Sequence, residues 1–235
     1  MVTVLAWVWI VLMARDMYGS MRGPAAWMMT PVWDGPHLAL LWAMWAVMMA
    51  AMMLPSASPI VVLYAGAVRN RPDPPRGMVQ VYALAAGYLL VWAGFSLGAT
   101  LLQRALSSLL VLTPMMEPAT PVAAALILVL AGIYQMTPLK QACLRACRSP
   151  LSFLMQHSRP RRAGAFRIGI EHGIYCLGCC WALMLILFAG GVMNLLVIVA
   201  LTAWVMVEKL APFGEQSARV SGALLIVTAG WLLLR

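Results

Sequence analysis

The sequence predicts an all-α protein, a polytopic transmembrane helical bundle of about seven spans that forms a single membrane domain over residues 1–235. Two observations predict this class. The chain is 63% hydrophobic and 10% charged with a mean hydropathy of +0.89, whereas a water-soluble domain is about half apolar and about a quarter charged. Its apolar runs also approach the roughly 17 to 25 residues that a helix needs to cross a bilayer.

Seven such runs occur along the chain. They are residues 2–14, 37–68, 79–103, 121–137, 173–190, 192–207 and 218–234. The first is short, but it has no basic segment before it and no small-residue cleavage site, so we expect a retained helix. Pro55 and Pro59 predict a break in the second run, because proline cannot donate a backbone hydrogen bond. Gly190 and Gly191 predict a tight hairpin between the fifth and sixth runs, with Asn194 as its cap.

The basic residues predict the orientation of the chain. Of the 16 Lys and Arg residues, twelve lie in or beside the loops at 69–76, 140–167 and 209–219, and four lie on the opposite side. An excess of Lys and Arg marks the cytoplasmic side of a membrane protein, so the N-terminus is predicted to be cytoplasmic. Loops that face the headgroups of the lipid bilayer account for the net charge of +9, and we predict no nucleic-acid partner.

Soft metal ligands gather at the predicted start of the fifth span. At about 100° per residue, a helix places Cys176 and Cys179 within about 40° of His172, and Cys180 about 80° away. One face of this helix therefore carries an imidazole and three thiols. Such a donor set suits a soft transition metal.

Two further thiols follow the fourth span. Cys143 and Cys147 are one helical turn apart, and the next loop returns the chain toward the fifth span, so two half-sites are predicted to converge on one metal. An odd total of five cysteines in a reducing compartment disfavours a disulfide scaffold. Lys140, Arg145, Arg148 and the N-terminal end of the fifth helix are predicted to stabilise thiolates there.

Methionine forms the second pattern. The chain has 19 Met residues, and five of them follow one predicted helix in two adjacent stripes: Met44, Met48 and Met52 in one, Met49 and Met53 in the other. Thioethers are neutral soft ligands that favour Cu(I) and are readily buried in lipid, so these side chains predict a transfer path for a monovalent ion. Core packing by adaptable methionine side chains is the alternative explanation.

Two other functions fit the same residues. A membrane thiol-disulfide redox protein would use Cys176 and Cys179 as one pair and Cys143 and Cys147 as its exchange partner. A non-catalytic helical subunit of a larger membrane complex would use the thiols for packing. At the end of the sixth span, Glu208 is predicted either to pair with Lys209 or to support His172.

Three segments carry a resemblance to a known family. They are Met-Ala-Ala-Met-Met-Leu-Pro-Ser at 49–56, the segment 132–150 with both of its cysteines, and the segment 169–184 with His-Gly-Ile-Tyr-Cys-Leu-Gly-Cys-Cys-Trp. From about Trp42 to Trp231 the chain resembles domain of unknown function 2182, a bacterial family of predicted metal-binding integral membrane proteins. The resemblance implies metal binding in the bacterial cytoplasmic membrane, and it names neither a metal nor a reaction.

The sequence therefore predicts a multi-pass membrane protein that binds Cu(I), with zinc as the alternative ion, and that requires no catalytic residues. Its predicted metal ligands share soft donor atoms and are His172, Cys176, Cys179, Cys180, Cys143, Cys147, Met44, Met48, Met49, Met52 and Met53. A metal donor or acceptor protein, or a larger membrane complex, is the expected partner.

Overall fold

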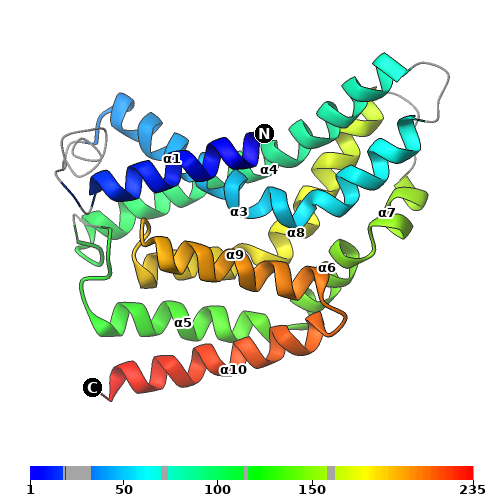
Figure 1. Ribbon diagram of the computed structural model, residues 1–235. Helices are drawn as coiled ribbons and strands as arrows, with labels where there is room; N and C mark the ends of the chain where they lie inside the picture. Colours follow the sequence, from blue (N-terminus) through cyan, green and yellow to red (C-terminus); the bar gives the residue numbers. More distant parts are fainter. Residues whose placement is uncertain (18, 20–32, 70–73, 114–115, 158–161, 235) are drawn as a thin grey trace.

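The computed structural model describes residues 1–17, 19, 33–69, 74–113, 116–157 and 162–234. These residues form α-helices joined by short turns, and they contain no β-structure beyond one bridge between Leu112 and Pro118. The helices are α1 (Val2–Met17), α3 (Gly35–Arg69), α4 (Pro74–Ser108), α5 (Pro121–Gln135), α6 (Pro138–Arg148), α7 (Pro150–His157), α8 (Arg162–Gly190), α9 (Leu195–Leu210) and α10 (Gly214–Leu233) (Figure 1). The all-α prediction is confirmed for this part of the chain.

The helices pack as a bundle in which α9 touches five others. Helix α4 packs along both α3 and α8, α5 packs along α10, and α9 contacts α1, α3, α6, α8 and α10. Figure 1 shows α5 and α10 side by side along one edge, with α1 crossing the opposite edge. The apolar core runs through the bundle and includes the three cysteines of α8 and the five methionines of α3.

The start of α8 differs from its prediction. Charged residues before position 173 suggest a loop, but α8 begins at Arg162, and Arg167 pairs with Glu171 at 2.8 Å one turn later in the same helix. Such a pair supports helix across a charged stretch. Residues 172–180 therefore lie in the middle of a 29-residue helix. Helix α7 likewise occupies part of the predicted inner loop.

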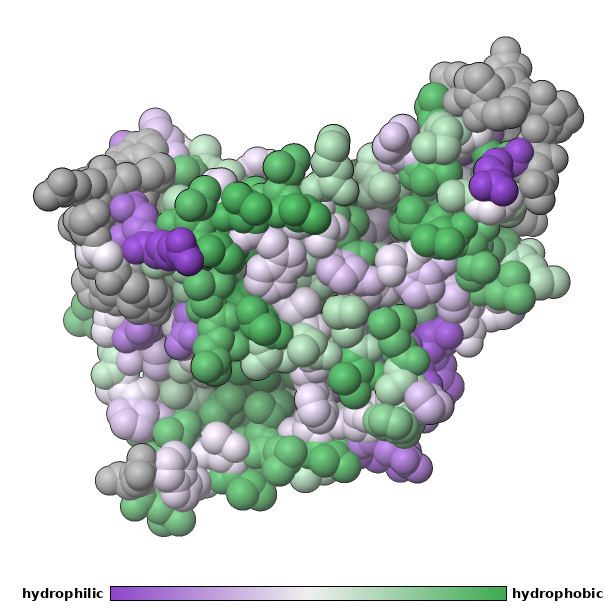
Figure 2. All heavy atoms as spheres, viewed as in Figure 1, coloured by the Kyte–Doolittle hydropathy of each residue, from purple (hydrophilic) through white to green (hydrophobic). Residues whose placement is uncertain are grey.

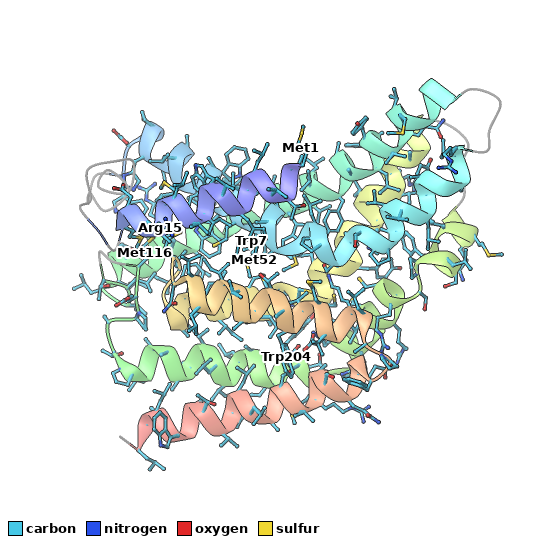
Figure 3. The ribbon with its side chains drawn as sticks, in the orientation of Figure 1. Met1, Trp7, Arg15, Met52, Met116 and Trp204 are labelled. Atoms are coloured by element: carbon cyan, nitrogen blue, oxygen red, sulfur yellow. The ribbon has the colours of Figure 1, made fainter. Side chains whose placement is uncertain are left out.

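The predicted break in α3 is a bend within a continuous helix. Both Pro55 and Pro59 lie inside α3, and Figure 1 shows the helix changing direction between its N-terminal and C-terminal halves. Pro55 cannot donate to the carbonyl of Ala51, and the indole Nε1 of Trp7 in α1 donates to it instead at 3.2 Å. Figure 3 shows Trp7 beside Met52, the neighbour of Ala51. The carbonyl of Pro55, freed by Pro59, accepts from Ser58 Oγ at 2.7 Å.

Glycines allow α4 and α8 to approach closely. A Cβ atom added at Gly87 would lie 2.1 Å from the carbonyl oxygen of Phe166, and one added at Gly169 would lie 2.0 Å from that of Leu84. Backbone therefore packs directly against backbone, as small residues permit between apolar helices. This contact fixes α8 against α4 about two turns before the cysteines.

Two short turns set the directions of the neighbouring helices. Gly191 has a φ of +89° and follows the last residue of α8, and Asn194 Oδ1 accepts from the amides of Leu196 and Val197 at the start of α9. The predicted hairpin with its Asn194 cap is confirmed. Between α5 and α6 the axis bends by 66°, and Thr137 caps the new helix. That bend turns α6 toward α8.

Several helices are suited to a bilayer. Among the described residues, Gly35–Arg69, Gly77–Ser108 and Gly164–Gly190 are long and apolar enough to cross a membrane, and α5 with α6 raises the number to four if the bent pair counts as one span. Large apolar side chains are exposed on the outer faces of the bundle, for example Leu97 and Leu101 on α4 and Leu126 and Leu130 on α5. Figure 2 shows apolar residues spread over one face. The seven spans and the cytoplasmic N-terminus stay predictions.

The Trp7 hydrogen bond gives the first test. We expect Trp7→Phe to lower the free energy of unfolding by about 1 to 3 kcal/mol, because the Ala51 carbonyl loses the donor that replaces the Pro55 amide. The matched control is Trp42→Phe. Trp42 Nε1 donates to the Ala93 carbonyl at 3.0 Å in an exposed setting. That carbonyl can also accept from the backbone amide of Leu97, because residue 97 is not a proline. Reversible unfolding in detergent measures both variants, and equal losses would contradict this role of Trp7.

Candidate metal centre

Four thiols from two helices meet inside the bundle. Cys176, Cys179 and Cys180 on α8 are at most 1% exposed. The sulfur of Cys179 lies 3.2 Å from that of Cys180 and 3.8 Å from that of Cys147 on α6. The Cys179 thiol donates to the backbone carbonyl of Cys176 at 3.1 Å, and the Cys176 thiol lies close to the other three. The thiols of α8 share one face because they recur at three- and four-residue spacing in one continuous helix. The contact with Cys147 shows that α6 packs beside this face.

A lysine and a tyrosine contact the Cys176 sulfur. Lys209 on α9 extends its Nζ to 2.9 Å from Cys176 Sγ and 3.0 Å from Ser56 Oγ on α3. The hydroxyl of Tyr88 on α4 lies 3.0 Å from the same sulfur and donates to the carbonyl of Met53 at 3.2 Å. Side chains from two further helices thus contact one α8 thiol, and Ser56 from a third helix accepts from the lysine.

His172 lies one turn before Cys176 and is 4% exposed. Its ring packs against the rings of Phe153 and Tyr88, with centroids 5.4 and 6.0 Å away. Among the described residues its Nδ1 atom has no hydrogen-bond partner. A cavity of about 140 Å³ adjoins the ring, and its lining includes Ser56, Cys147, His172 and Lys209. This cavity therefore connects the Cys147 thiol with a buried imidazole whose Nδ1 atom has no partner among the described residues.

Cys143 faces a different part of α8. Its sulfur would lie 2.7 Å from a Cβ atom added at Gly178, so the thiol occupies the space that this glycine leaves. The hydroxyl of Tyr134 on α5 donates to the Gly178 carbonyl on the same side at 2.5 Å. The structure therefore brings Cys147 to the other thiols and places Cys143 against Gly178. A ligand role for Cys143 stays a prediction.

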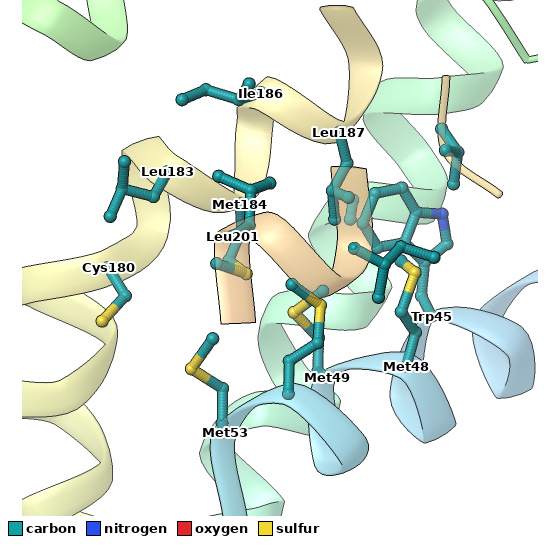
Figure 4. Close-up of a cluster of buried hydrophobic side chains, with 14 of the residues drawn as sticks. Trp45, Met48, Met49, Met53, Cys180, Leu183, Met184, Ile186, Leu187 and Leu201 are labelled. Carbon is teal, nitrogen blue, oxygen red and sulfur yellow. The ribbon is translucent and has the colours of Figure 1, made fainter. Parts of the chain in front are cut away.

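The predicted methionine ladder lies wholly in the core. Met44, Met48, Met49, Met52 and Met53 are all 0% exposed. Figure 4 shows Met48, Met49 and Met53 along α3, facing Met184 of α8, with Cys180 beyond them. The hydrogen bonds of Tyr88 to the Met53 carbonyl and to the Cys176 sulfur join the end of the ladder to the thiols. Burial of this kind fits both core packing and a transfer path.

A second polar network holds α6 in place. Lys140 is 0% exposed, and its Nζ donates to Glu208 Oε2 on α9 at 2.6 Å and to the Cys179 carbonyl on α8 at 2.5 Å. Glu208 Oε1 accepts from Gln135 on α5 and from Trp204 at 2.6 and 2.9 Å. The predicted pairing of Glu208 with Lys209 is wrong, because successive residues of a helix point about 100° apart.

The charges near the thiols also differ from the prediction. Arg145 pairs with Glu215 at 3.6 Å on the exposed surface, and Arg148 donates to the carbonyls of Ala211 and Pro212. The N-terminal end of α8 lies ten residues before His172 in the chain, beyond the single turn over which a helix dipole acts. Among the described residues, Lys209 is therefore the cation that contacts a thiol. The predicted role of the helix end is wrong, and the roles of Arg145 and Arg148 stay predictions.

The donor set fits a soft monovalent ion after a small rearrangement. In the described part of the chain no three or more His, Cys, Asp or Glu side chains are arranged to hold a metal ion as they stand. Two sulfurs bound to one ion at about 2.3 Å each lie about 3.8 to 4.6 Å apart. The Cys147 to Cys179 distance of 3.8 Å falls in that interval, and the Cys179 to Cys180 distance of 3.2 Å does not. Rotation about the Cα–Cβ bond of Cys180 would lengthen the distance between its sulfur and that of Cys179.

Comparison with known proteins identifies the family. A family model described as "PpoB2: Copper chaperone" matches residues 42–232. The chain belongs to the PpoB2 copper chaperone family. No curated protein and no solved structure matches the chain. The resemblance to domain of unknown function 2182 is not confirmed by this match.

The PpoB2 match includes every predicted ligand and both buried networks, and it begins after α1. The sequence analysis did not predict that Tyr88 and Lys209 contact the thiols. Tyr88 is an ordinary aromatic residue in an apolar run and gives no signal. Lys209 does give a signal in the sequence, because an ionisable residue at the end of an apolar span marks a functional site unless its partner is evident. Its adjacent Glu208 suggested a partner that the helix geometry excludes.

The Lys140 to Glu208 pair gives the second test. We expect Glu208→Gln to lower the free energy of unfolding by about 3 to 5 kcal/mol, because it leaves a buried ammonium without its counterion. Adding Lys140→Met should recover part of that loss, since the new amide oxygen still accepts from Gln135 and Trp204. A double-mutant cycle in detergent measures this coupling.

The exposed pair of Arg145 and Glu215 is the matched control for that cycle. Its side chains are 60% and 34% exposed, so the same kind of cycle should give a coupling below about 1 kcal/mol. Equal couplings for the buried and exposed pairs would show that the buried pair does not hold α6 in place.

Proposed function

We propose that the protein is a membrane-embedded copper chaperone that binds Cu(I) through Cys147, Cys176, Cys179, Cys180 and His172 and transfers it to an acceptor protein. The observation that carries this proposal is the meeting of four thiols from α6 and α8 in the core of a chain that belongs to a copper chaperone family. Copper is the cargo of the protein, so no catalytic residue is required.

The chemistry of the donor set supports Cu(I). Thiolates are soft ligands that select Cu(I), zinc and iron-sulfur clusters, and imidazole adds a ligand of intermediate softness. Cu(I) binds with two or three ligands, which suits thiols that contact one another without forming a tetrahedral cage. Zinc is the alternative ion, because four thiols in a tetrahedron form a structural zinc site.

We propose that the methionines of α3 form the path by which copper reaches or leaves the thiols. Met44, Met48, Met49, Met52 and Met53 are neutral, so a monovalent ion can pass among them by ligand exchange without a change in its charge. The path would end where Tyr88 links Met53 to Cys176. Beyond the thiols, the cavity beside His172 and Cys147 would be the point of transfer to the partner.

We propose that this bundle lies in the bacterial cytoplasmic membrane with its N-terminus inside. The exposed apolar side chains and the three helices that are long enough to span a bilayer support the membrane assignment. The excess of Lys and Arg in the predicted inner loops supports the orientation. The thiols would then lie midway along α8, in the interior of the membrane domain.

One observation favours a thiol-disulfide relay as the second candidate function. The sulfurs of Cys147 and Cys179 come from different helices and are 3.8 Å apart, so a small movement would let them form a disulfide. Alkylation after an acid quench followed by mass spectrometry distinguishes the two functions. A relay predicts trapped disulfides, whereas a chaperone predicts reduced thiols that bound copper protects from alkylation.

The thiols give the third test. We expect protein with Cys176→Ser and Cys179→Ser to lose most of its bound copper, because a hydroxyl is a poor ligand for Cu(I). The matched control is Cys143→Ser, which removes a thiol that packs against Gly178. Elemental analysis of detergent-purified protein measures copper in each variant. Copper that is unchanged in the double variant would contradict the site.

The methionine path gives the fourth test. We expect Met49→Leu with Met53→Leu to slow the loading of Cu(I) and to leave the final copper content unchanged. Leucine is close to methionine in volume, so the stability cost should stay below about 1.5 kcal/mol. Met155→Leu on α7, at a side chain that is 72% exposed, is the control. Equal loading rates in all three proteins would assign these methionines to core packing.

A further inference from the structure

Lys209 is a buried cation with an unusual set of partners. It is 7% exposed, and its Nζ donates to Ser56 Oγ and Cys176 Sγ. The adjacent carboxylate of Glu208 pairs with Lys140 at 2.6 Å. The groups to which Lys209 Nζ donates are thus a hydroxyl and a thiol.

Physical chemistry requires compensation for this ammonium. Moving a charged amine from water into a protein interior is costly unless an opposite charge lies close to it. Ser56 can accept a hydrogen bond but carries no charge. The thiols are therefore the groups that can supply negative charge beside Lys209.

Copper binding by thiolates creates such a charge. One Cu(I) ion with two thiolate ligands has a net charge of −1, and in an apolar interior that anion is as costly to bury as the free ammonium is. With Lys209 included, the net charge of the group is zero. Each of the two charges thus removes the cost of burying the other.

The other nearby cations are engaged elsewhere. Lys140 donates to the Glu208 carboxylate at 2.6 Å, so its charge is already neutralised. Arg148 donates to the carbonyls of Ala211 and Pro212. Lys209 is the described cation whose charged atom touches a sulfur of the site.

We propose that Lys209 is the countercharge of the copper-thiolate complex, a positioning residue that holds Cys176 toward the other thiols and neutralises the complex in the apolar core. This proposal rests on the proposed function, because it requires Cu(I) at these thiols. It adds that affinity for a monovalent soft ion depends on a lysine that is not itself a ligand.

The test compares three substitutions at Lys209 in full-length protein in detergent. Cu(I) affinity is measured without oxygen by competition with a chromophoric Cu(I) chelator. Lys209→Met removes the charge, Lys209→Gln keeps a hydrogen-bond donor without it, and Lys209→Arg keeps the charge. We expect Cu(I) affinity to fall about tenfold or more in the first two variants and to stay within about threefold in Lys209→Arg. Arg145→Met removes an exposed positive charge from α6 and should leave the affinity unchanged.

A cycle with Cys176→Ser separates the countercharge from a structural role. In that background Lys209→Gln should have little further effect on Cu(I) affinity, since the contact is already lost. Circular dichroism establishes that each variant keeps its helices, and if Lys209→Met does not fold, Lys209→Gln still decides the result. Additive losses in the cycle would overturn the proposal, and so would equal losses in all three Lys209 variants.

The two proposals fail in different ways. Copper content that does not depend on Cys176 and Cys179 would refute the proposed function. Copper that does depend on these thiols, together with unchanged affinity in Lys209→Gln and Lys209→Met, would refute the countercharge alone.

Discussion

The structure depends on the ion pair between Lys140 and Glu208 in the interior of an apolar bundle. Lys140 also donates to the carbonyl of Cys179, so one side chain of α6 holds both α8 and α9. Without it, α6 would have little reason to enter the core, because this helix is polar overall and carries three basic residues. Its position brings Cys147 to within 3.8 Å of Cys179. The thiol group therefore exists because an ion pair fixes the helix that supplies its fourth member.

Adjacent residues of α9 serve the two polar networks of the core. Glu208 faces α5, α6 and α10, and Lys209 faces α3 and α8. A helix separates neighbouring side chains by about 100°, so two charges that look like a pair in the sequence point into different networks. The bend of α3 contributes in the same way. Ser56 lies between the two prolines, binds Lys209, and donates to the carbonyl of Met53. The end of the methionine ladder and the thiols consequently share one set of hydrogen bonds.

Composition and periodicity predicted the all-α fold and a helix for each apolar run, because burial of apolar side chains dominates there. The Asn194 cap and the glycine turn before α9 were also predictable, since their causes are local. The start of α8 was not, because the pair of Arg167 with Glu171 supports helix where charge suggests a loop. For the site, helical spacing placed His172, Cys176 and Cys179 on one face. It could not show that Cys147 rather than Cys143 reaches them, since both occupy the same face of α6 and the packing at Gly178 decides between them. Tyr88 and Lys209 reach the site from distant parts of the chain, which local patterns do not reveal.

In this member of a copper chaperone family, soft donor atoms lie in an apolar bundle, buried methionines lie on the neighbouring helix, and a cavity beside His172 reaches Cys147. The central claim is that Cu(I) binds to the sulfurs of this group. X-ray absorption spectroscopy of the copper-loaded, detergent-purified protein tests it most directly. The account predicts Cu(I) with two or three sulfur neighbours at about 2.2 to 2.3 Å, close to the metal-sulfur distances of thiolate sites. Copper surrounded by nitrogen and oxygen atoms alone would contradict it.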